Sequence, residues 1–494
     1  MRARARRGRG RGLRVVPSAL VLALAVSWAC RSPEDATPEQ RSRTNLVLVL
    51  ADDLGYGELG CFGQERIQTP CLDALSQEGL RLTSFYAGST VCAPSRAVLM
   101  TGQHTGRTWV RGNGGGDRQT LRAEDVTVAE VLRDAGYATA LFGKWGLGEI
   151  GTSGHPNAKG FETFFGYLDQ RHAHNYYPEF LIRNTERVAL RNVTDPRWTE
   201  RRLARGAADV GAGYAAPDGR IDYSHDLVVD EALAWLGERT PEQPFFLFLA
   251  LTVPHANNEG RQGTGNGQEV PDHGPYAALD WTEPNKGQAA MITRLDRDVG
   301  RLRAVLEARG LARRTLVLFS SDNGPHAEGG QDPEFFRASG PLRGLKRSLT
   351  EGGIRVPTIA WWPGTIAPDT TSDLPFSFAD VFATAAELAE ASLPPDTQSV
   401  SFAPVLRGEP APPVPEFLYW EFYEQGSRQA VRFGDTKAIR EPMVHGPIQV
   451  YDLAVDPGEE RDLADSRPEL VARARALLEE AHEPNPRWRV PPEK

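Results

Sequence analysis

The sequence lacks an excess of basic residues. Its 494 residues include 56 Lys and Arg against 65 Asp and Glu, which gives a formal net charge of −9. Seven arginines and no acidic residue lie in the first thirty positions, so the remainder holds 49 basic and 65 acidic residues, a net charge of −16. Because affinity for nucleic-acid phosphates depends on clustered Lys and Arg, this composition argues against nucleic-acid binding. It still allows a local basic pocket for a small anion.

The N-terminus lacks an apolar run long enough to span a bilayer comfortably. Val15 to Val26 is apolar but short, and it follows the basic segment from Met1 to Arg7. This pattern is typical of a secretory signal, and Cys30 after small residues resembles a bacterial lipoprotein attachment site. We therefore expect residues 1–30 to be a signal peptide and residues 31–43 a tether. The protein would be exported to the bacterial periplasm or cell surface, either lipid-anchored to the membrane or soluble.

Cysteine is also scarce, with four in the whole chain. Cys30 would leave with the signal or carry lipid, while Cys61 and Cys71 are close enough in sequence to pair in an oxidising compartment. Cys92 then has no partner, which is unusual in an exported protein. It precedes Pro94 at the expected start of a helix, where free N–H groups and the helix dipole favour an anion. From its position alone, Cys92 could be a nucleophile, half of a disulfide or something else.

Four short apolar runs predict strands that are buried on both faces, as in a parallel sheet. They are Asn45–Leu50, Ala138–Phe142, Phe245–Leu251 and Leu316–Phe319. Helical patterns lie between them, at Thr127–Ala135, His225–Arg239 and Ala289–Arg309. This alternation predicts an α/β fold, a large doubly wound domain with a mostly parallel sheet.

Polar side chains that could bind a metal or take part in catalysis follow all four predicted strands. In chain order they are Asp52 and Asp53, Lys144, His255, and Asp322 and Asn323. In doubly wound sheets the ligand lies beyond the carboxyl ends of the strands, so we expect these side chains to meet. A single Asp after a strand is more often a turn or cap residue, but four such strand ends together favour a site.

The strand ends lack the His and Cys spacing of a zinc site. Three carboxylates and one amide oxygen favour a hard divalent cation, calcium or magnesium. Adjacent carboxylates also repel each other unless a cation or a proton lies between them. Lys144, His255 and Lys346 would supply donors to an oxyanion. The residues therefore predict an anionic ester held between one metal and several cationic groups.

Several motifs together resemble a known family. Cys92-Ala-Pro-Ser-Arg96 with Thr101-Gly102 is similar to the cysteine-type sulfatase signature, and Gly143-Lys-Trp145 resembles the second signature. The acidic motifs, Lys346 and the run from Glu351 to Pro357 stand in the family's order. The resemblance covers residues 45–464 and is to type I, formylglycine-dependent sulfatases of the alkaline phosphatase superfamily, such as arylsulfatase A and N-acetylgalactosamine-6-sulfatase.

The resemblance implies a role for each motif. A maturation enzyme would oxidise Cys92 to formylglycine, whose hydrate attacks the sulfur of a sulfate ester and later expels sulfate. The implied ligands of calcium, or alternatively of magnesium, are residue 92, Asp52, Asp53, Asp322 and Asn323. The other implied groups are Arg96, which orients the diol, and Lys144, His255 and Lys346, which bind sulfate oxygens or assist the leaving group.

The sequence departs from the family at one position. The second signature usually reads Lys-Trp-His-Leu-Gly, and here it reads Lys144-Trp-Gly146-Leu-Gly148. That histidine is thought to accept the diol proton during sulfate release, so another group would have to do so in this chain. His326, which follows the predicted metal ligands, is the favoured replacement, with His104 or a water as alternatives.

The segment from Asp169 to Pro178 predicts sugar binding. It contains Arg171, His172 and His174, which can bond hydroxyls, and a tyrosine pair whose rings can stack on a sugar. The alternative is a polar surface loop with both tyrosines in the core. We expect the substrate to be a sulfated saccharide of the galactose or N-acetylgalactosamine type, or an aryl sulfate.

Three parts are expected after the tether. They are a catalytic domain at 44–400, a proline-rich linker at 401–415 and a C-terminal subdomain at 416–494. Short strand-like runs and a helix from Pro468 to His482 predict a small antiparallel sheet with one helix that completes the pocket wall. Polar insertions at 191–220 and 257–286 predict long loops at the rim of the site.

Two other functions fit part of this pattern. A phosphoesterase or phosphonate hydrolase of the same superfamily could use similar metal ligands. A two-zinc phosphatase, however, should show a further set of Asp and His ligands, and the sequence has no convincing one. The other rival is a non-catalytic glycan-binding lipoprotein with an unmodified Cys92, for which the full set of donors around the thiol has no purpose.

Overall fold

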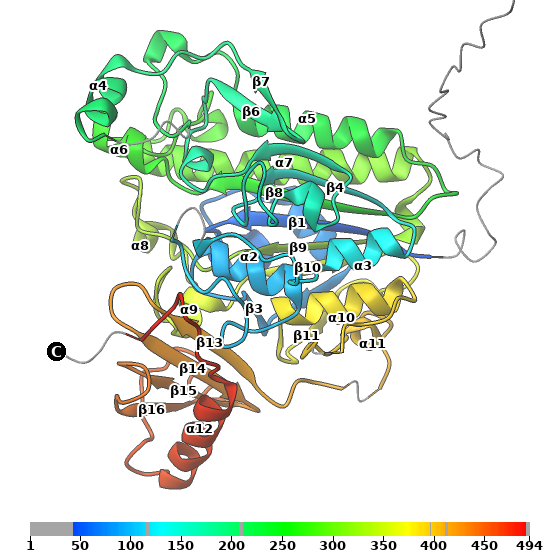
Figure 1. Ribbon diagram of the computed structural model, residues 1–494, viewed down its shortest axis with the longest axis vertical. Helices are drawn as coiled ribbons and strands as arrows, with labels where there is room; N and C mark the ends of the chain where they lie inside the picture. Colours follow the sequence, from blue (N-terminus) through cyan, green and yellow to red (C-terminus); the bar gives the residue numbers. More distant parts are fainter. Residues whose placement is uncertain (1–42, 115–117, 207–210, 396, 411–412, 491–494) are drawn as a thin grey trace, which may run out of the picture.

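The structure, a computed structural model, describes residues 43–114, 118–206, 211–395, 397–410 and 413–490. The predicted signal peptide and residues 31–42 of the tether lie outside this part of the chain. Figure 1 shows a large α/β domain and, beside it, a small sheet with one helix near the C-terminus. In the described part of the chain, no helix is both long and apolar enough to cross a membrane.

A ten-stranded sheet forms the centre of the large domain, in the order β11-β2-β10-β9-β1-β8-β4-β5-β6-β7. The five middle strands are parallel: β9 (Thr315–Ser321), β1 (Asn45–Asp52), β8 (Phe245–Pro254), β4 (Ala138–Lys144) and β5 (Thr163–Tyr167). The outer strands are β11 (Thr370–Ser372), β2 (Leu80–Leu82), β10 (Thr358–Trp361), β6 (Phe180–Arg183) and β7 (Glu186–Ala189). The predicted α/β fold with a mostly parallel sheet is confirmed.

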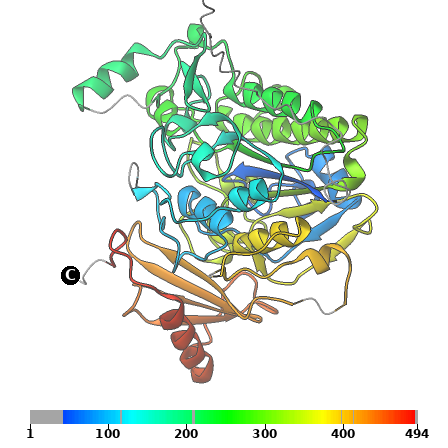
Figure 2. The same cartoon turned by 45° about the vertical axis from the view of Figure 1, so that its right-hand side comes forward.

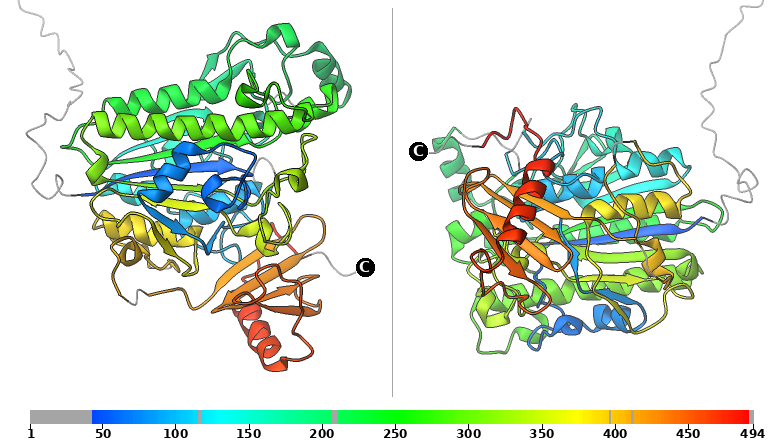
Figure 3. Two further views of the ribbon diagram at one scale, coloured as in Figure 1. Left: turned by 180° about the vertical axis from the view of Figure 1, so that it is seen from behind. Right: turned by 90° about the horizontal axis from the view of Figure 1, so that it is seen from below.

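Helices cover both faces of this sheet. One face carries α1 (Pro70–Gln77), α5 (Ser224–Gly237) and α7 (Glu283–Ala308), of which α5 and α7 run side by side in Figure 3. The other face carries α2 (Cys92–Thr101), α3 (Val128–Asp134) and α10 (Phe378–Leu388). Strand β1 serves both layers, because Val47 and Val49 pack on the α5 and α7 side while Leu46 and Leu48 pack on the α2 and α10 side. This two-sided burial explains its continuous apolar sequence.

The C-terminal subdomain is an antiparallel sheet with one helix, as predicted (Figure 2). Its elements are β13 (Leu418–Phe422), β14 (Arg428–Phe433), β15 (Thr436–Arg440), β16 (Ile448–Asp452) and α12 (Pro468–Ala481). One face packs on α12 through Val431, Val450 and Leu478. The other packs on the large domain, where Trp420 Nε1 donates to the Ala87 carbonyl at 2.9 Å. The sheet therefore packs against the segment that leads into α2.

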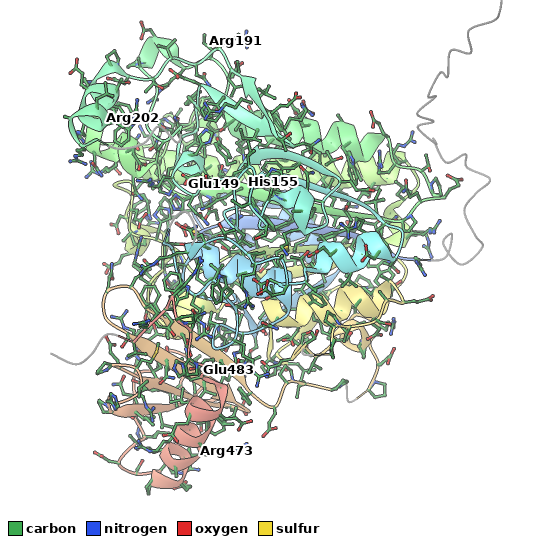
Figure 4. The ribbon with its side chains drawn as sticks, viewed as in Figure 1. Glu149, His155, Arg191, Arg202, Arg473 and Glu483 are labelled. Carbon is green, nitrogen blue, oxygen red and sulfur yellow. The ribbon has the colours of Figure 1, made fainter. Side chains whose placement is uncertain are left out.

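Other short elements include β3 (Phe85–Tyr86), β12 (Phe376–Ser377), α8 (Pro333–Phe336) and α9 (Glu351–Ile354). The two predicted rim loops contain helices, α4 (Pro196–Ala204) and α6 (Asn258–Thr264). Figure 4 places Arg191 and Arg202 in the lobe around α4, at the opposite end of the molecule from Arg473 on α12.

Two expectations from the sequence differ from the structure. The predicted linker at 401–415 begins with a short helix, α11 (Ala403–Leu406), because Phe402 and Leu406 are buried in the core beside α10. The expected pairing of Cys61 with Cys71 is wrong, since both are free thiols. Closeness in sequence did not bring these two side chains together.

Candidate active site

The carboxyl ends of four parallel strands bring together the acidic and basic groups predicted from the sequence. Asp52 is the last residue of β1, Lys144 the last of β4, His255 follows β8, and Asp322 follows β9. Asp53 has a left-handed backbone with φ 67°, which interrupts the alternation of the strand. Asp52 and Asp53 can therefore both face one site, and candidate ligand atoms of Asp52, Asp53, Cys92 and His255 all lie within 4.8 Å of one another.

Buried ion pairs connect these groups. The three shortest are Lys144 Nζ with Asp52 Oδ2 at 2.6 Å, Lys346 Nζ with Asp53 Oδ2 at 2.7 Å, and Arg96 Nη2 with Asp322 Oδ2 at 2.9 Å. Arg96 also donates from Nε to Asp322 at 3.0 Å and from Nη1 to the carbonyl of Lys144. Because each carboxylate has a cationic partner, all three charges can be held away from water.

The carboxylates do not have equal proton affinities. Burial favours the neutral form of Asp52, but Lys144, followed by His255 and Arg96, outweighs burial and lowers the pKa of Asp52. For Asp322, burial and then the charge of Asp52 raise the pKa to about 7 despite the contact with Arg96. Carboxylates this close together repel each other, and a divalent cation between them would remove that repulsion.

Asn323 supports this metal hypothesis. Its Nδ2 donates to Asp53 Oδ1 at 2.7 Å, whereas its Oδ1 is buried and has no hydrogen-bond partner among the described residues. A buried carbonyl oxygen without a donor is costly, and coordination of a cation would satisfy it. Since Asp52, Asp53 and Asp322 also offer oxygen atoms, the donor set fits a hard cation such as calcium or magnesium.

Cys92 is the first residue of α2 and is buried. Its Sγ lies 3.4 Å from Asp52 Oδ1, and the following amide, Ala93 N, donates to Asn113 Oδ1 at 3.0 Å. Burial and then the neighbouring charge of Asp52 raise the pKa of Cys92 well above its usual value. The thiol is therefore protonated near neutral pH, which argues against a thiolate nucleophile.

His255 and Lys346 both approach Asp53, with His255 Nε2 at 3.5 Å and Lys346 Nζ at 2.7 Å from its Oδ2. Lys346 Nζ is 3.2 Å from His255 Nε2, and His255 Nδ1 is 2.8 Å from the carbonyl of Ala256. Burial and then Lys346 lower the pKa of His255 well below its usual value, so the ring is neutral. In that state Nδ1–H donates to Ala256 and Nε2 accepts from Lys346. The ring of His174 stacks on His255, with ring centroids 4.5 Å apart.

A cleft of about 390 Å³ opens over these groups. Of the predicted site residues, Cys92, His255, Lys346, Arg171 and His174 line it. Its other walls are polar, and its volume falls in the range that takes a small ligand. The arrangement can hold an anionic group against Cys92 and Lys346.

Some predicted residues lie elsewhere. His172 packs on Tyr167 and Phe180 and does not line the cleft. Tyr176 and Tyr177, the expected sugar-stacking pair, are buried in the core, and Tyr176 Oη donates to the carbonyl of Thr252 at 2.8 Å. The two tyrosines are therefore core residues, as the alternative expected of them, whereas sugar binding by the rest of the segment stays a prediction.

The two histidines proposed to replace the missing one are both outside the cleft wall. His326 lies behind His255; its Nδ1 accepts from Glu328 N at 3.0 Å and its Nε2 is 3.2 Å from the carbonyl of Pro254. His104 packs on Tyr419 of the C-terminal sheet, and burial lowers its pKa to about 4. The role of His326 in proton transfer therefore stays a prediction, because both of its ring nitrogens have backbone partners. His104 Nε2 is buried without a hydrogen-bond partner among the described residues, but its ring does not line the cleft.

Sequence reasoning missed several residues of the cleft wall. These are Asn113, Gln119, Gln170, Asn258, Glu328 and Arg347. Arg347 and Gln170 directly adjoin predicted residues, so their neighbourhood in sequence was a usable signal. The C-terminal sheet also contributes, since Glu424 accepts from Asn113 N at 2.9 Å and Arg428 donates to the carbonyl of Arg347 at 3.0 Å. This supports the prediction that the subdomain completes the pocket wall.

Comparison with known families agrees with this site. The family model described as Sulfatase matches residues 44–391, and that described as N-sulphoglucosamine sulphohydrolase, C-terminal, matches residues 345–483. The chain belongs to the sulfatase family. It is similar to arylsulfatase A of Homo sapiens, with 33% identity over 93% of this chain and 90% of that protein. It is also similar to N-acetylgalactosamine-6-O-sulfatase of Bacteroides thetaiotaomicron, with 28% identity over 93% of this chain and 97% of that protein.

A solved structure shows the shared fold. The crystal structure of Ps i-CgsB in complex with k-i-k-neocarrahexaose superposes with a TM-score of 0.73, at 24% identity, over 91% of this chain and 95% of that chain. This sulfatase is therefore a sulfuric ester hydrolase with an alkaline phosphatase-like α/β domain.

Proposed function

We propose that this sulfatase hydrolyses sulfate esters of glycans by means of a formylglycine formed from Cys92 and one divalent cation, calcium or alternatively magnesium. The observation that carries the proposal is the setting of residue 92. It lies at the cleft beside Asp52, in surroundings that raise the thiol pKa and so disfavour a thiolate. Hydrated formylglycine would supply two hydroxyls, one to attack sulfur and one to lose its proton as sulfate leaves.

The residues around position 92 have complementary tasks in this proposal. Asp52, Asp53, Asp322 and Asn323 would hold the cation, whose charge would polarise the sulfate oxygens. Arg96, fixed on Asp322 by two hydrogen bonds, keeps that carboxylate in place beside Lys144. Lys346 faces the cleft and can donate to a sulfate oxygen.

Protonation of the leaving alcohol falls to the pair of His255 and Lys346. Their side chains are 3.2 Å apart, and both line the cleft. Neutral His255 accepts from Lys346 at Nε2 and so holds the ammonium in place, and another N–H of Lys346 can donate to the departing oxygen. A positioned acid of this kind typically contributes roughly 10²–10⁴-fold to the rate.

The proposed substrate class is a sulfated saccharide of the galactose or N-acetylgalactosamine type. Support comes from a relative named N-acetylgalactosamine-6-O-sulfatase and from the polar cleft wall, where Arg171, His174 and Asn258 can bond hydroxyls. We further propose that the protein is exported, either soluble or anchored through Cys30, and that a formylglycine-generating enzyme acts on it.

A phosphatase of the same superfamily is the main rival. Among the described residues, the one other group of three candidate ligands is His225, Asp226 and Asp298, on α5 and α7, and arginines bind both of its carboxylates. The test compares release of nitrophenol from 4-nitrophenyl sulfate and 4-nitrophenyl phosphate by protein carrying formylglycine and calcium. We expect higher kcat/KM for the sulfate. Preference for the phosphate would contradict the proposal.

A further inference from the structure

The side chain of Gln170 lies where a side chain at position 146 would be, beside the cleft. Gly146 has φ 77°, and a Cβ atom built there would lie 2.2 Å from Gln170 Nε2 and 2.8 Å from its Cδ. Non-bonded atoms cannot approach so closely in a close-packed protein. The amide of Gln170 therefore fills the volume that a side chain at position 146 would take.

The backbone fixes this approach. Parallel pairing between β4 and β5 continues beyond both strands, because Trp145 N donates to Tyr167 O at 2.9 Å and Gly146 N donates to Leu168 O at 3.1 Å. Gln170 follows two residues later, before the short helical turn at His172–His174. The position of Gln170 is thus set by the carboxyl ends of β4 and β5, and Lys144 is the last residue of β4.

The amide nitrogen of Gln170 is a hydrogen-bond donor without an acceptor in the described structure. Its Nε2 is buried and has no hydrogen-bond partner within the part of the chain that the structure describes. Other polar groups of the same cleft are engaged: Gln119 donates to Gly146 O at 3.2 Å, and Asn258 donates to Glu328 at 2.8 Å. Buried donors normally have acceptors, so this one is suited to an acceptor that arrives with a ligand.

We propose that Gln170 is a substrate-binding residue that donates from Nε2 to a sulfate oxygen of the ester held at residue 92. The inference rests on the proposed function and deepens it. Gln170 and Cys92 line the same cleft, and sulfate presents only acceptor oxygens. The cations at residues 96, 144 and 346 are already bonded to carboxylates, whereas Gln170 Nε2 has no competing acceptor. An amide carries no titratable proton, so Gln170 binds sulfate without acting as the missing base.

Two variants separate donation from space filling. Gln170→Met keeps the length of the side chain and removes the donor, and Gln170→Ala removes both. With 4-nitrophenyl sulfate, both variants should lose roughly 10- to 100-fold in kcat/KM, as expected for a hydrogen bond to a charged group. Gln262→Met, on the exposed surface of α6, is the matched control and should behave like the wild type.

A third variant tests the donor through pH. Gln170→Glu keeps the shape but presents a carboxylate to the sulfate, so it should be more impaired than Gln170→Met at pH 8. Protonation turns that carboxyl into a donor, so its activity relative to the wild type should recover as the pH falls. The ratio of Gln170→Met to the wild type should stay constant with pH. Equal ratios for the two variants at every pH would overturn the proposal.

Binding without turnover provides an independent readout. In a Cys92→Ala background, calorimetry should show that Gln170→Met weakens binding of 4-nitrophenyl sulfate by about the same factor as it lowers kcat/KM. If the wild type releases sulfate but Gln170→Met equals it in both kcat/KM and binding, Gln170 only fills space and the inference is wrong. If wild-type protein with formylglycine and calcium releases no sulfate, the proposed function itself fails.

Discussion

Asn323 donates from its amide nitrogen to Asp53 Oδ1 at 2.7 Å, which leaves its amide oxygen buried without a partner in the described structure. Together with a second bond from Nδ2 to the Gly324 carbonyl at 2.9 Å, this hydrogen bond fixes the orientation of the amide. The oxygen can then join Asp52, Asp53 and Asp322 around a cation. A neutral ligand among three acids also limits the repulsion that the site must offset.

Asn323→Ala should therefore weaken calcium binding and lower kcat. We expect at least about a tenfold loss of affinity, the lower end of what loss of metal-site partners costs. Calcium affinity is measured by titration calorimetry, with Asp226→Asn in the distant group on α5 and α7 as the control that should bind normally. Unchanged calcium binding by Asn323→Ala, or tightly held zinc in active protein, would refute the assignment.

His326→Ala tests whether His326 accepts the diol proton in place of the histidine that is missing at position 146. If His326 assists sulfate release, the variant should show a burst of alcohol followed by slow turnover, with a loss of roughly 10²–10⁴-fold. His104→Ala, which changes a residue outside the cleft, should show no burst. A raised KM without a burst would mean that His326 only positions Glu328 and the β8 end, to which its ring nitrogens bond.

Stability should depend on pH through Asp380, which is buried at the start of α10. Burial raises its pKa to about 7, although Val400 N and Ser377 N donate to it. Because the folded pKa lies above the unfolded value of 3.8, the native state binds more protons between these values. The contribution of Asp380 to the free energy of unfolding should therefore fall by up to about 4 kcal/mol as the pH rises from 4 to 7, and then level off.

Asp380→Asn should flatten this dependence. Urea denaturation at several pH values measures it, and Asp465→Asn, at an exposed position, should keep the wild-type slope. A slope in Asp380→Asn as steep as that of the wild type would show that other groups cause it.

The C-terminal subdomain is held by a buried charge cluster. Lys437 Nζ contacts Glu351 Oε1 at 2.8 Å and Glu459 Oε1 at 3.0 Å, and all three side chains are fully buried. Lys437→Met should destabilise the protein by about 3–5 kcal/mol, because it leaves buried Glu459 without its cation and leaves Glu351 with Arg355 alone. Arg407→Met breaks the exposed pair with Glu387 and should cost less than about 1 kcal/mol. Similar urea midpoints for the two variants would contradict this account.

The sequence predicts the fold best at strands that are buried on both faces of the sheet. A strand such as β1, with helices on both faces, must be apolar throughout, so its pattern is visible without a structure. The first polar residues after such a strand then stand out, as Asp52 and Asp322 do. Their convergence follows from parallel pairing alone, and the structure confirms it.

Other features depend on contacts that no local pattern records. Gln170 lies in the segment predicted to bind sugar, but its place beside Gly146 depends on the hydrogen bond from Gly146 N to Leu168 O, which no local pattern records. The two tyrosines predicted to stack on a sugar belong to the core, where the Tyr176 hydroxyl donates a hydrogen bond to the carbonyl of Thr252, a residue distant in sequence. Residues of this kind are predictable only after the register of the sheet is known.

The identity of residue 92 in active protein is the central claim. Mass spectrometry of the peptide that ends at Arg96 should show formylglycine at position 92, with sulfate release from 4-nitrophenyl sulfate in proportion to its fraction. Cys92→Ala should fold and bind calcium yet release no sulfate, whereas Cys61→Ala, which changes another free thiol, should remain active. Full activity in a preparation whose residue 92 is entirely unmodified cysteine would contradict the account.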